Sequence, residues 1–229
     1  MIYGLYESPI HPQAPDFWLS EFTRNSAGLP NEPNAAQHAN LVRLATEVAQ
    51  PLRNMVGALN VNSGFRTPEV NASIPGSSDT SEHMEGLAAD FGNDWFSGRE
   101  LAAYLWTRTD LPLGQVIWYT TKGHVHVSYD PNNRRDFRRG DPDGHERSWR
   151  PEPGEVDAVL QKVAGGAPDA GTAPRPHPQR PYEGPSHPPQ APRGESGGGG
   201  GGVLLLLALI GAGAAAARAR GKGRRRRRR

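Results

Sequence analysis

A change of composition near residue 165 limits what this chain can fold into. Apolar side chains are concentrated before that point, whereas residues 167–196 contain nine prolines and almost no large apolar group. A segment of that composition cannot bury enough apolar surface to offset the entropy lost on folding. We therefore expect a folded domain at 1–165, long enough for one hydrophobic core. A disordered Pro/Gly-rich linker should follow at 166–202.

The end of the chain holds two further segments. Residues 203–217 are uncharged and mostly Leu and Ala, and as a helix they would span about 22 Å. We favour a short transmembrane helix here, with bilayer thinning to match its length. The Arg-rich tail at 218–229 would stay on the cytoplasmic side, so that the N-terminal domain faces outward. The alternative is an unstructured end whose arginines contact anionic lipid or nucleic acid.

The positive net charge of the chain comes from this tail. Nine of the 26 basic residues lie in it, which leaves 17 basic residues against 24 acidic ones elsewhere. A globally basic nucleic-acid-binding domain is therefore excluded, and we expect no specific nucleic-acid partner. The chain has no cysteine, which excludes disulfides, thiolate metal ligands and cysteine nucleophiles. We see no secretory signal at its N-terminus.

Hydrophobic periodicity predicts several helices and strands within 1–165. Residues 1–33 carry five prolines and should be irregular, and loop chemistry is expected at 68–79. We expect helices at 34–56, 98–107 and 155–163, and strands at 59–66, 115–119 and 124–129. Pro51 should kink or divide the first helix, and a capping box at Ser97 should start the second.

The segment SEHMEGLAAD places a histidine and a carboxylate where they can converge. In a straight helix His83 and Asp90 would lie about 10 Å apart along the axis. That is too far for ligands of one zinc ion, each of which lies roughly 2 Å from the metal. Gly86 predicts a turn, after which residues 87–91 run extended. Alternate residues of that strand then face the core, and Asp90 points back toward His83.

The segment HVHVSY predicts a second strand with a histidine-bearing face. Alternation places His124, His126 and Ser128 on one face and apolar residues on the other. Two histidines, one carboxylate and an open fourth position are typical of a catalytic rather than a structural zinc site. Each residue alone is more often a solvated or hydrogen-bonded side chain, and only the combination supports a metal site. The remaining histidines are interpreted as surface, loop or linker residues: His11, His38, His145, His177 and His187.

Three separated segments resemble the zinc D-alanyl-D-alanine carboxypeptidase family of metallopeptidases, family M15, including its phage endolysin-type members. They are SGFRTPEVN (63–71), GSSDTSEHMEGLAADF (76–91) and HVHVSY (124–129). The resemblance covers about residues 15–130. It implies an α+β fold, with a small antiparallel sheet and flanking helices around a zinc cleft. It also implies that His83, Asp90 and His126 are the ligands of one zinc ion.

The same resemblance implies roles for residues around the metal. Arg66 matches the arginine associated with substrate binding and charge stabilisation, and Ser81 would support the ligand geometry or contact the substrate. Many relatives carry an acidic general base three positions before the last ligand, where this chain has Gly123. His124 is our first candidate for the base, because it shares a face with His126 and histidine titrates near neutral pH. The weaker candidates are Glu82 and Glu85.

The activity implied by the resemblance is hydrolysis of a peptide bond in peptidoglycan stem peptides. The enzyme would be a zinc-dependent D-Ala-D-Ala carboxypeptidase or an endolysin-like endopeptidase, acting as a monomer. The alternative, favoured by Gly123, is a non-hydrolytic zinc-stabilised module that binds the cell wall or belongs to a virion. We expect either a membrane-anchored protein facing the cell wall or a phage lysis or virion protein.

Overall fold

The computed structural model describes residues 8–166. In chain order the elements are β1 (Pro9–His11), β2 (Ala14–Trp18), α1 (Leu19–Thr23), α2 (Ala35–Leu44), the π-helical η2 (Ala45–Ala49), α3 (Gln50–Val56), β3 (Asn60–Ser63), α4 (Pro68–Ala72), the 3-10 helix η3 (Glu82–Glu85), β4 (Ala88–Gly92), α5 (Gly98–Thr107), β5 (Leu113–Tyr119), β6 (His124–Tyr129), β7 (Asp136–Gly140), β8 (Glu146–Ser148) and α6 (Pro153–Ala164). The apolar segment and the Arg-rich tail, and all but the first residue of the predicted linker, lie outside this range. None of the helices within it is long and apolar enough to cross a membrane.

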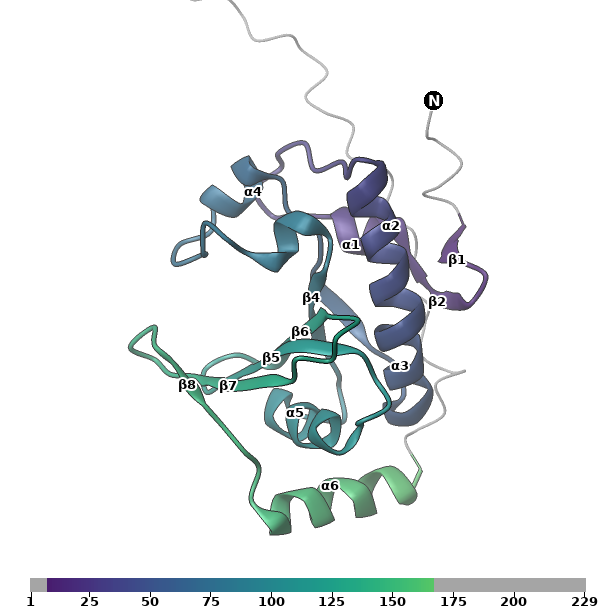
Figure 1. The fold of residues 1–229 in the computed structure, drawn as a ribbon, viewed down its shortest axis with the longest axis vertical. Coiled ribbons are helices and arrows are strands. Elements are labelled where there is room, and N and C mark those ends of the chain that lie inside the picture. Colours follow the sequence, from purple (N-terminus) through teal and green to yellow (C-terminus); the bar gives the residue numbers. More distant parts are fainter. Residues whose placement is uncertain (1–7, 167–229) are drawn as a thin grey trace, which may run out of the picture. The chain divides into compact units, whose positions relative to one another are not determined.

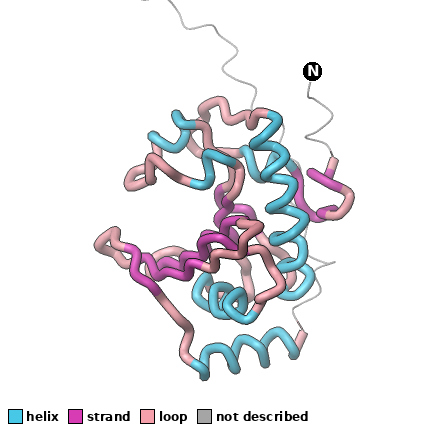
Figure 2. Tube along the Cα trace, viewed as in Figure 1, coloured by secondary structure: helices cyan, strands magenta, loops and turns pink. Residues whose placement is uncertain are grey.

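A six-stranded sheet forms the centre of the fold, in the order β3-β4-β6-β5-β7-β8, while β1 and β2 form a separate hairpin. Figure 2 shows the strands gathered between the surrounding helices. All neighbours in the large sheet are antiparallel except β5 and β7, which run parallel. The expected α+β fold with antiparallel pairing is confirmed, and the parallel pair adds the β7–β8 hairpin. This hairpin projects from the body of the fold (Figure 1).

One face of the sheet is buried under helices. Phe91 of β4 and Val125 and Val127 of β6 are fully buried, in one hydrophobic cluster with residues of α2, η2, α3 and α5. Because successive strand residues point to opposite faces, Asp90 and His126 emerge on the other side. The helices therefore fix the sheet from one face and leave its polar face for a site.

The long helix predicted at 34–56 is present and continuous, as α2, η2 and α3. Asn34 starts it, with its side chain accepting hydrogen bonds from two backbone amides of the first turn. Pro51 does not divide the helix: it lies near the start of α3, directly after the π-helical turn. Gly57 ends the helix with a φ of 82°, as a glycine stop allows.

Several elements differ from the expectation. The irregular structure predicted for 1–33 is wrong where β1, β2 and α1 form, because an edge hairpin tolerates prolines that a central strand would not. The loop predicted for 68–79 contains α4, where Thr67 caps the helix and Pro68 occupies its first position. Proline is common at that position, because the N–H that it lacks would have no partner within the helix. The strand predicted at 59–66 ends at Ser63 as β3.

Candidate metal centre

Pairing between β4 and β6 brings Asp90 and His126 together. The two residues lie directly opposite each other in the antiparallel register. His126 Nδ1 lies 3.1 Å from Asp90 Oδ1, and both residues are over 90% buried. The sheet itself therefore sets the distance between these two side chains.

His83 reaches the same point from η3, which Gly86 ends. Gly86 has a φ of 70°, and a Cβ there would overlap the carbonyl oxygen of Gln37 in α2. The Gln37 side chain in turn donates a hydrogen bond to the carbonyl of Met84. This close packing, and the turn that the sequence predicts at Gly86, place His83 Nε2 3.4 Å from Asp90 Oδ1.

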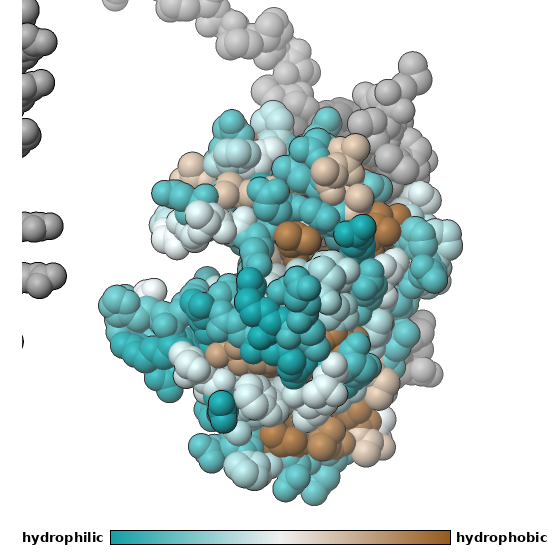
Figure 3. Space-filling view, in the orientation of Figure 1, coloured by the Kyte–Doolittle hydropathy of each residue, from teal (hydrophilic) through white to brown (hydrophobic). Residues whose placement is uncertain are grey.

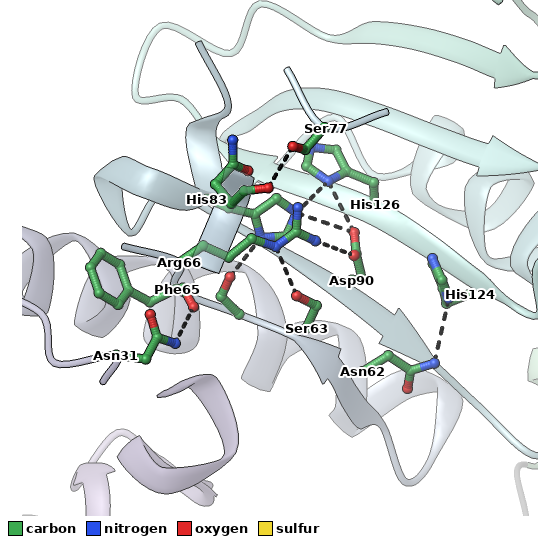
Figure 4. Close-up of polar contacts among 12 residues, drawn as sticks. Asn31, Asn62, Ser63, Phe65, Arg66, Ser77, His83, Asp90, His124 and His126 are labelled. Atoms are coloured by element: carbon green, nitrogen blue, oxygen red, sulfur yellow. Dashed lines mark hydrogen bonds and ion pairs between the residues drawn. The ribbon is translucent and has the colours of Figure 1, made fainter. Parts of the chain in front are cut away.

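The three side chains present their donor atoms to one another. His83 Nε2 lies 3.1 Å from His126 Nδ1, and one ligand atom from each of His83, Asp90 and His126 lies within 4.8 Å of the others. His83 Nδ1 is 2.6 Å from the carbonyl oxygen of Gly64, which can only accept a hydrogen bond. The proton of a neutral His83 is thereby held on Nδ1, and its Nε2 lone pair faces the centre. Figure 4 shows this convergence.

The charges of the group suit a cation. Burial disfavours an ionised Asp90, but His83 and His126 outweigh it and hold the pKa of that carboxyl well below its usual range. Burial lowers the pKa of His83 and outweighs the opposing effect of Asp90. At neutral pH Asp90 is thus anionic and His83 neutral, the forms in which both bind a metal ion.

Arg66 lies behind Asp90 and holds it in place. Its Nη2 donates to Asp90 Oδ2 at 3.1 Å, and its Nε donates to Ser63 Oγ at 3.0 Å. The buried Asn31 fixes the backbone on either side of Arg66: its side chain donates to the carbonyl of Phe65 (Figure 4) and accepts from the amide of Thr67. Since Arg66 occupies Oδ2, the other carboxylate oxygen is left to face the histidines.

Residues 16–128 match the family model for peptidase M15. This segment is similar to the peptidase M15 family. No curated protein matches the chain. The match suggests a peptidase, and the His-Asp-His group could hold a metal ion.

The other predicted site residues lie around the group of His83, Asp90 and His126, and their surroundings differ. His124 is half-buried, and its Nδ1 lies 3.5 Å from the side-chain amide of Asn62 (Figure 4). Burial lowers the pKa of His124, and Asp90 opposes this. The hydroxyl of Ser81 makes no hydrogen bond with any residue in the range 8–166.

The two glutamates considered as bases point to other partners or to solvent. Glu82 forms an ion pair with Arg134, with 2.9 Å between Oε1 and Nη2. Glu85 is exposed. Gly123 lies in the turn before β6, where a Cβ would meet no atom within 4 Å. The structure therefore leaves room for a side chain at Gly123, but the chain supplies none.

Sequence reasoning missed much of the support around the candidate metal centre. The Gly64 carbonyl, Ser63 and Asn31 carry no motif of their own, because each acts through backbone or hydroxyl contacts that only the fold creates. Tyr119 was also missed, although its place in a predicted strand puts it on the histidine face.

The surface in front of the sheet is hollowed. Figure 3 shows a hydrophilic recess between the segment around α4 and the β7–β8 hairpin. In the ribbon view, strands β4, β5 and β6 lie toward the inner end of this recess (Figure 1). A polar peptide could enter there without crossing the apolar core.

Proposed function

We propose that this protein is a zinc metallopeptidase that hydrolyses a peptide bond in peptidoglycan stem peptides. The observation that carries the proposal is the convergence of His83 Nε2, His126 Nδ1 and Asp90 Oδ1 within an M15 segment. The resemblance of its three motifs to zinc D-Ala-D-Ala carboxypeptidases supports that activity, or the related endopeptidase activity of endolysin-type members.

The donor set fits zinc. Two imidazole nitrogens and one carboxylate oxygen are common zinc ligands, and three protein ligands leave a position open for water or substrate. When bound, zinc would supply Lewis-acid polarisation of a carbonyl and water acidified to a pKa of about 7. All three side chains are buried in the fold, so little side-chain ordering is required on binding.

The chain's own residues would orient the ligands and move the proton. The Gly64 carbonyl fixes the tautomer of His83, and Arg66 fixes the orientation of Asp90. In the hydrolysis, the oxygen of water bonds to the carbonyl carbon and the carbon–nitrogen bond breaks. The departing nitrogen takes up one proton of that water. We assign the transfer of this proton to His124, which lies on the same strand face as His126.

The second candidate function is a non-hydrolytic zinc-stabilised module that binds the cell wall. Gly123 favours it, because the position of the acidic base in many relatives has no side chain here. The ion pair between Glu82 and Arg134 adds support, since it occupies one of the nearby carboxylates. This function requires the same metal ligands and the same recess but no proton transfer.

Cleavage of defined fragments distinguishes the two. The purified full chain, loaded with zinc, is incubated with a stem pentapeptide ending in D-Ala-D-Ala and with a cross-linked dimer, and products are identified by mass spectrometry. We expect cleavage that a chelator abolishes. Loss of the terminal D-Ala would identify a carboxypeptidase, and scission of the dimer an endopeptidase.

Two histidine variants control that experiment. His126→Ala should abolish cleavage, whereas His145→Ala changes an exposed histidine of the β7–β8 turn and should leave it intact. Binding of both fragments without any cleavage would favour the non-hydrolytic module. Activity that survives in His126→Ala would refute the metal-centred proposal.

A further inference from the structure

Tyr119 lies on the same face of the sheet as the metal ligands. It is the last residue of β5, and β5 pairs with β6 so that Ile117 lies opposite His126 and Trp118 opposite Val125. Continuing that register puts Tyr119 opposite His124, and the two rings lie 5.8 Å apart in an edge-on arrangement. Alternation along β5 then directs Tyr119 to the side of His126.

The ring of Tyr119 is held in place by three neighbours. On the adjacent strand β7, Gly140 lies opposite Tyr119 in the parallel register, and a Cβ on Gly140 would overlap the tyrosine ring. The ammonium of Lys122 lies 4.0 Å from the ring centroid, within the range of a cation–π contact. The glycine lets the ring lie across β7, and Lys122 and His124 restrict it there.

The hydroxyl of Tyr119 is an unused donor. It makes no hydrogen bond with any residue in the range 8–166, although the side chain is half-buried. Burial, Asp90 and Glu146 together raise the pKa of Tyr119, and Arg66 opposes them. The hydroxyl therefore keeps its proton at neutral pH.

Several other polar donors near the centre are already engaged. Arg66 directs Nε to Ser63 and Nη2 to Asp90, and the side-chain amide of Asn62 is turned toward His124. A neutral hydroxyl held without a partner in a half-buried position suits an acceptor that arrives with the substrate. A phenol can donate to a carbonyl oxygen whose negative charge grows during the reaction, and that charge strengthens the bond.

We propose that the Tyr119 hydroxyl donates a hydrogen bond to the carbonyl oxygen of the scissile peptide bond as negative charge develops on it. This rests on the proposed peptidase function. Tyr119 gives up no proton in this role, so the balance of the hydrolysis is unchanged. Gly140 acts as a positioning residue, because it gives the ring its place.

Kinetics of Tyr119→Phe test this assignment, since phenylalanine keeps the ring contacts and removes only the hydroxyl. We expect kcat to fall about 100-fold with KM nearly constant, as for the loss of one oxyanion donor. Zinc affinity, measured by chelator competition, should not change. A phosphinate analogue of the scissile dipeptide should lose affinity by a similar factor, because it mimics the charged oxygen.

Two further variants complete the test. Tyr129→Phe removes a hydroxyl from the opposite, core-facing side of the same sheet and should leave kcat unchanged. Gly140→Ala should displace the ring and lower kcat, again with KM and zinc affinity retained. If Tyr119→Phe changed KM alone, the hydroxyl would bind the substrate equally in the ground state and the transition state, and the proposal would be overturned.

The remaining outcomes separate this inference from the proposed function. If the wild-type protein cleaves and Tyr119→Phe cleaves equally well, only the role of Tyr119 is refuted. Loss of zinc by Tyr119→Phe would also refute it, since the effect would then be structural. If the wild-type protein cleaves neither fragment, the proposed function fails, and the role of Tyr119 fails with it.

Discussion

Asp90 and His126 lie directly opposite each other on β4 and β6, with 3.1 Å between Asp90 Oδ1 and His126 Nδ1. The pair is separated by 36 positions in sequence, yet the register of two central strands fixes it. The opposite face of both strands is packed into the core. A shift of either strand by one residue would turn its side chain into that core, so the stability of the sheet and the geometry of the centre are linked.

Removing a ligand should remove the metal. We expect Asp90→Asn and His83→Ala each to lower zinc affinity by more than about 100-fold. That is more than is lost when a residue that only orients a metal ligand is removed. Competition with a chromogenic chelator measures this directly. Asp79→Asn, an exposed carboxylate outside the centre, is the matched control and should bind zinc like the wild type. Equal affinity of the Asp90 variant would exclude Asp90 as a ligand.

Arg66 should affect zinc through Asp90. Arg66→Gln should lower zinc affinity about 10- to 100-fold, as expected when a residue that orients a ligand is removed. Arg66→Lys should recover little of the lost zinc affinity. The single ammonium group of lysine cannot donate to Ser63 and Asp90 together, as the planar guanidinium group does. The exposed Arg43 provides a control in Arg43→Gln. Wild-type zinc affinity in Arg66→Gln would mean that Asp90 keeps its position without the ion pair.

Gly86 and Gly76 form a matched pair for the turn that carries His83. Both have positive φ, of 70° and 77°, but a Cβ at Gly86 would overlap the Gln37 carbonyl whereas one at Gly76 meets nothing within 4 Å. Gly76→Ala should cost only the strain of that conformation, about 1–2 kcal/mol in the free energy of unfolding. Gly86→Ala should cost more and should also weaken zinc binding.

Thermal and denaturant unfolding, with zinc titration of both variants, check the comparison of the two glycines. Equal destabilisation in the two alanine variants would show that the close packing between η3 and α2 is unimportant.

Glu21 should make stability depend on pH. Burial raises the pKa of its carboxyl above the ordinary value of 4.5, and the hydrogen bond from Trp18 opposes this only in part. The folded state therefore binds the proton more tightly than the unfolded state. Its contribution to stability is complete below pH 4.5 and is lost as pH rises through the folded-state pKa. Glu21→Gln removes this dependence.

Denaturant unfolding at several pH values tests the prediction for Glu21. Relative to the wild type, Glu21→Gln should gain stability as the pH is raised from 4 to 7. A difference in the free energy of unfolding that stays constant over this range would contradict the assigned pKa shift.

The sequence predicts the centre of this fold better than its edges. The strand at 124–129 and the helix at 98–107 agree with β6 and α5 in both bounds, because a strict alternation and a capping box mark them. The turn at Gly86 is also confirmed. These local signals are enough to bring His83 and Asp90 toward the same face.

The β7–β8 hairpin carries no comparable signal. Its strands are rich in charge, and their pairing depends on a parallel contact with β5 and on side-chain ion pairs such as that between Arg138 and Glu146. Neither follows from periodicity. The place of Tyr119 across Gly140 could not be predicted for the same reason, since it requires the register between β5 and β7.

Zinc titration of the metal-free full chain, with cleavage of a stem peptide as the readout, tests whether the proposed peptidase activity depends on one zinc ion. We predict no cleavage without zinc and an initial rate that rises until one zinc ion is bound per chain, with no rise in His126→Ala. Cleavage by the metal-free protein, or none at one bound equivalent of zinc, would contradict it.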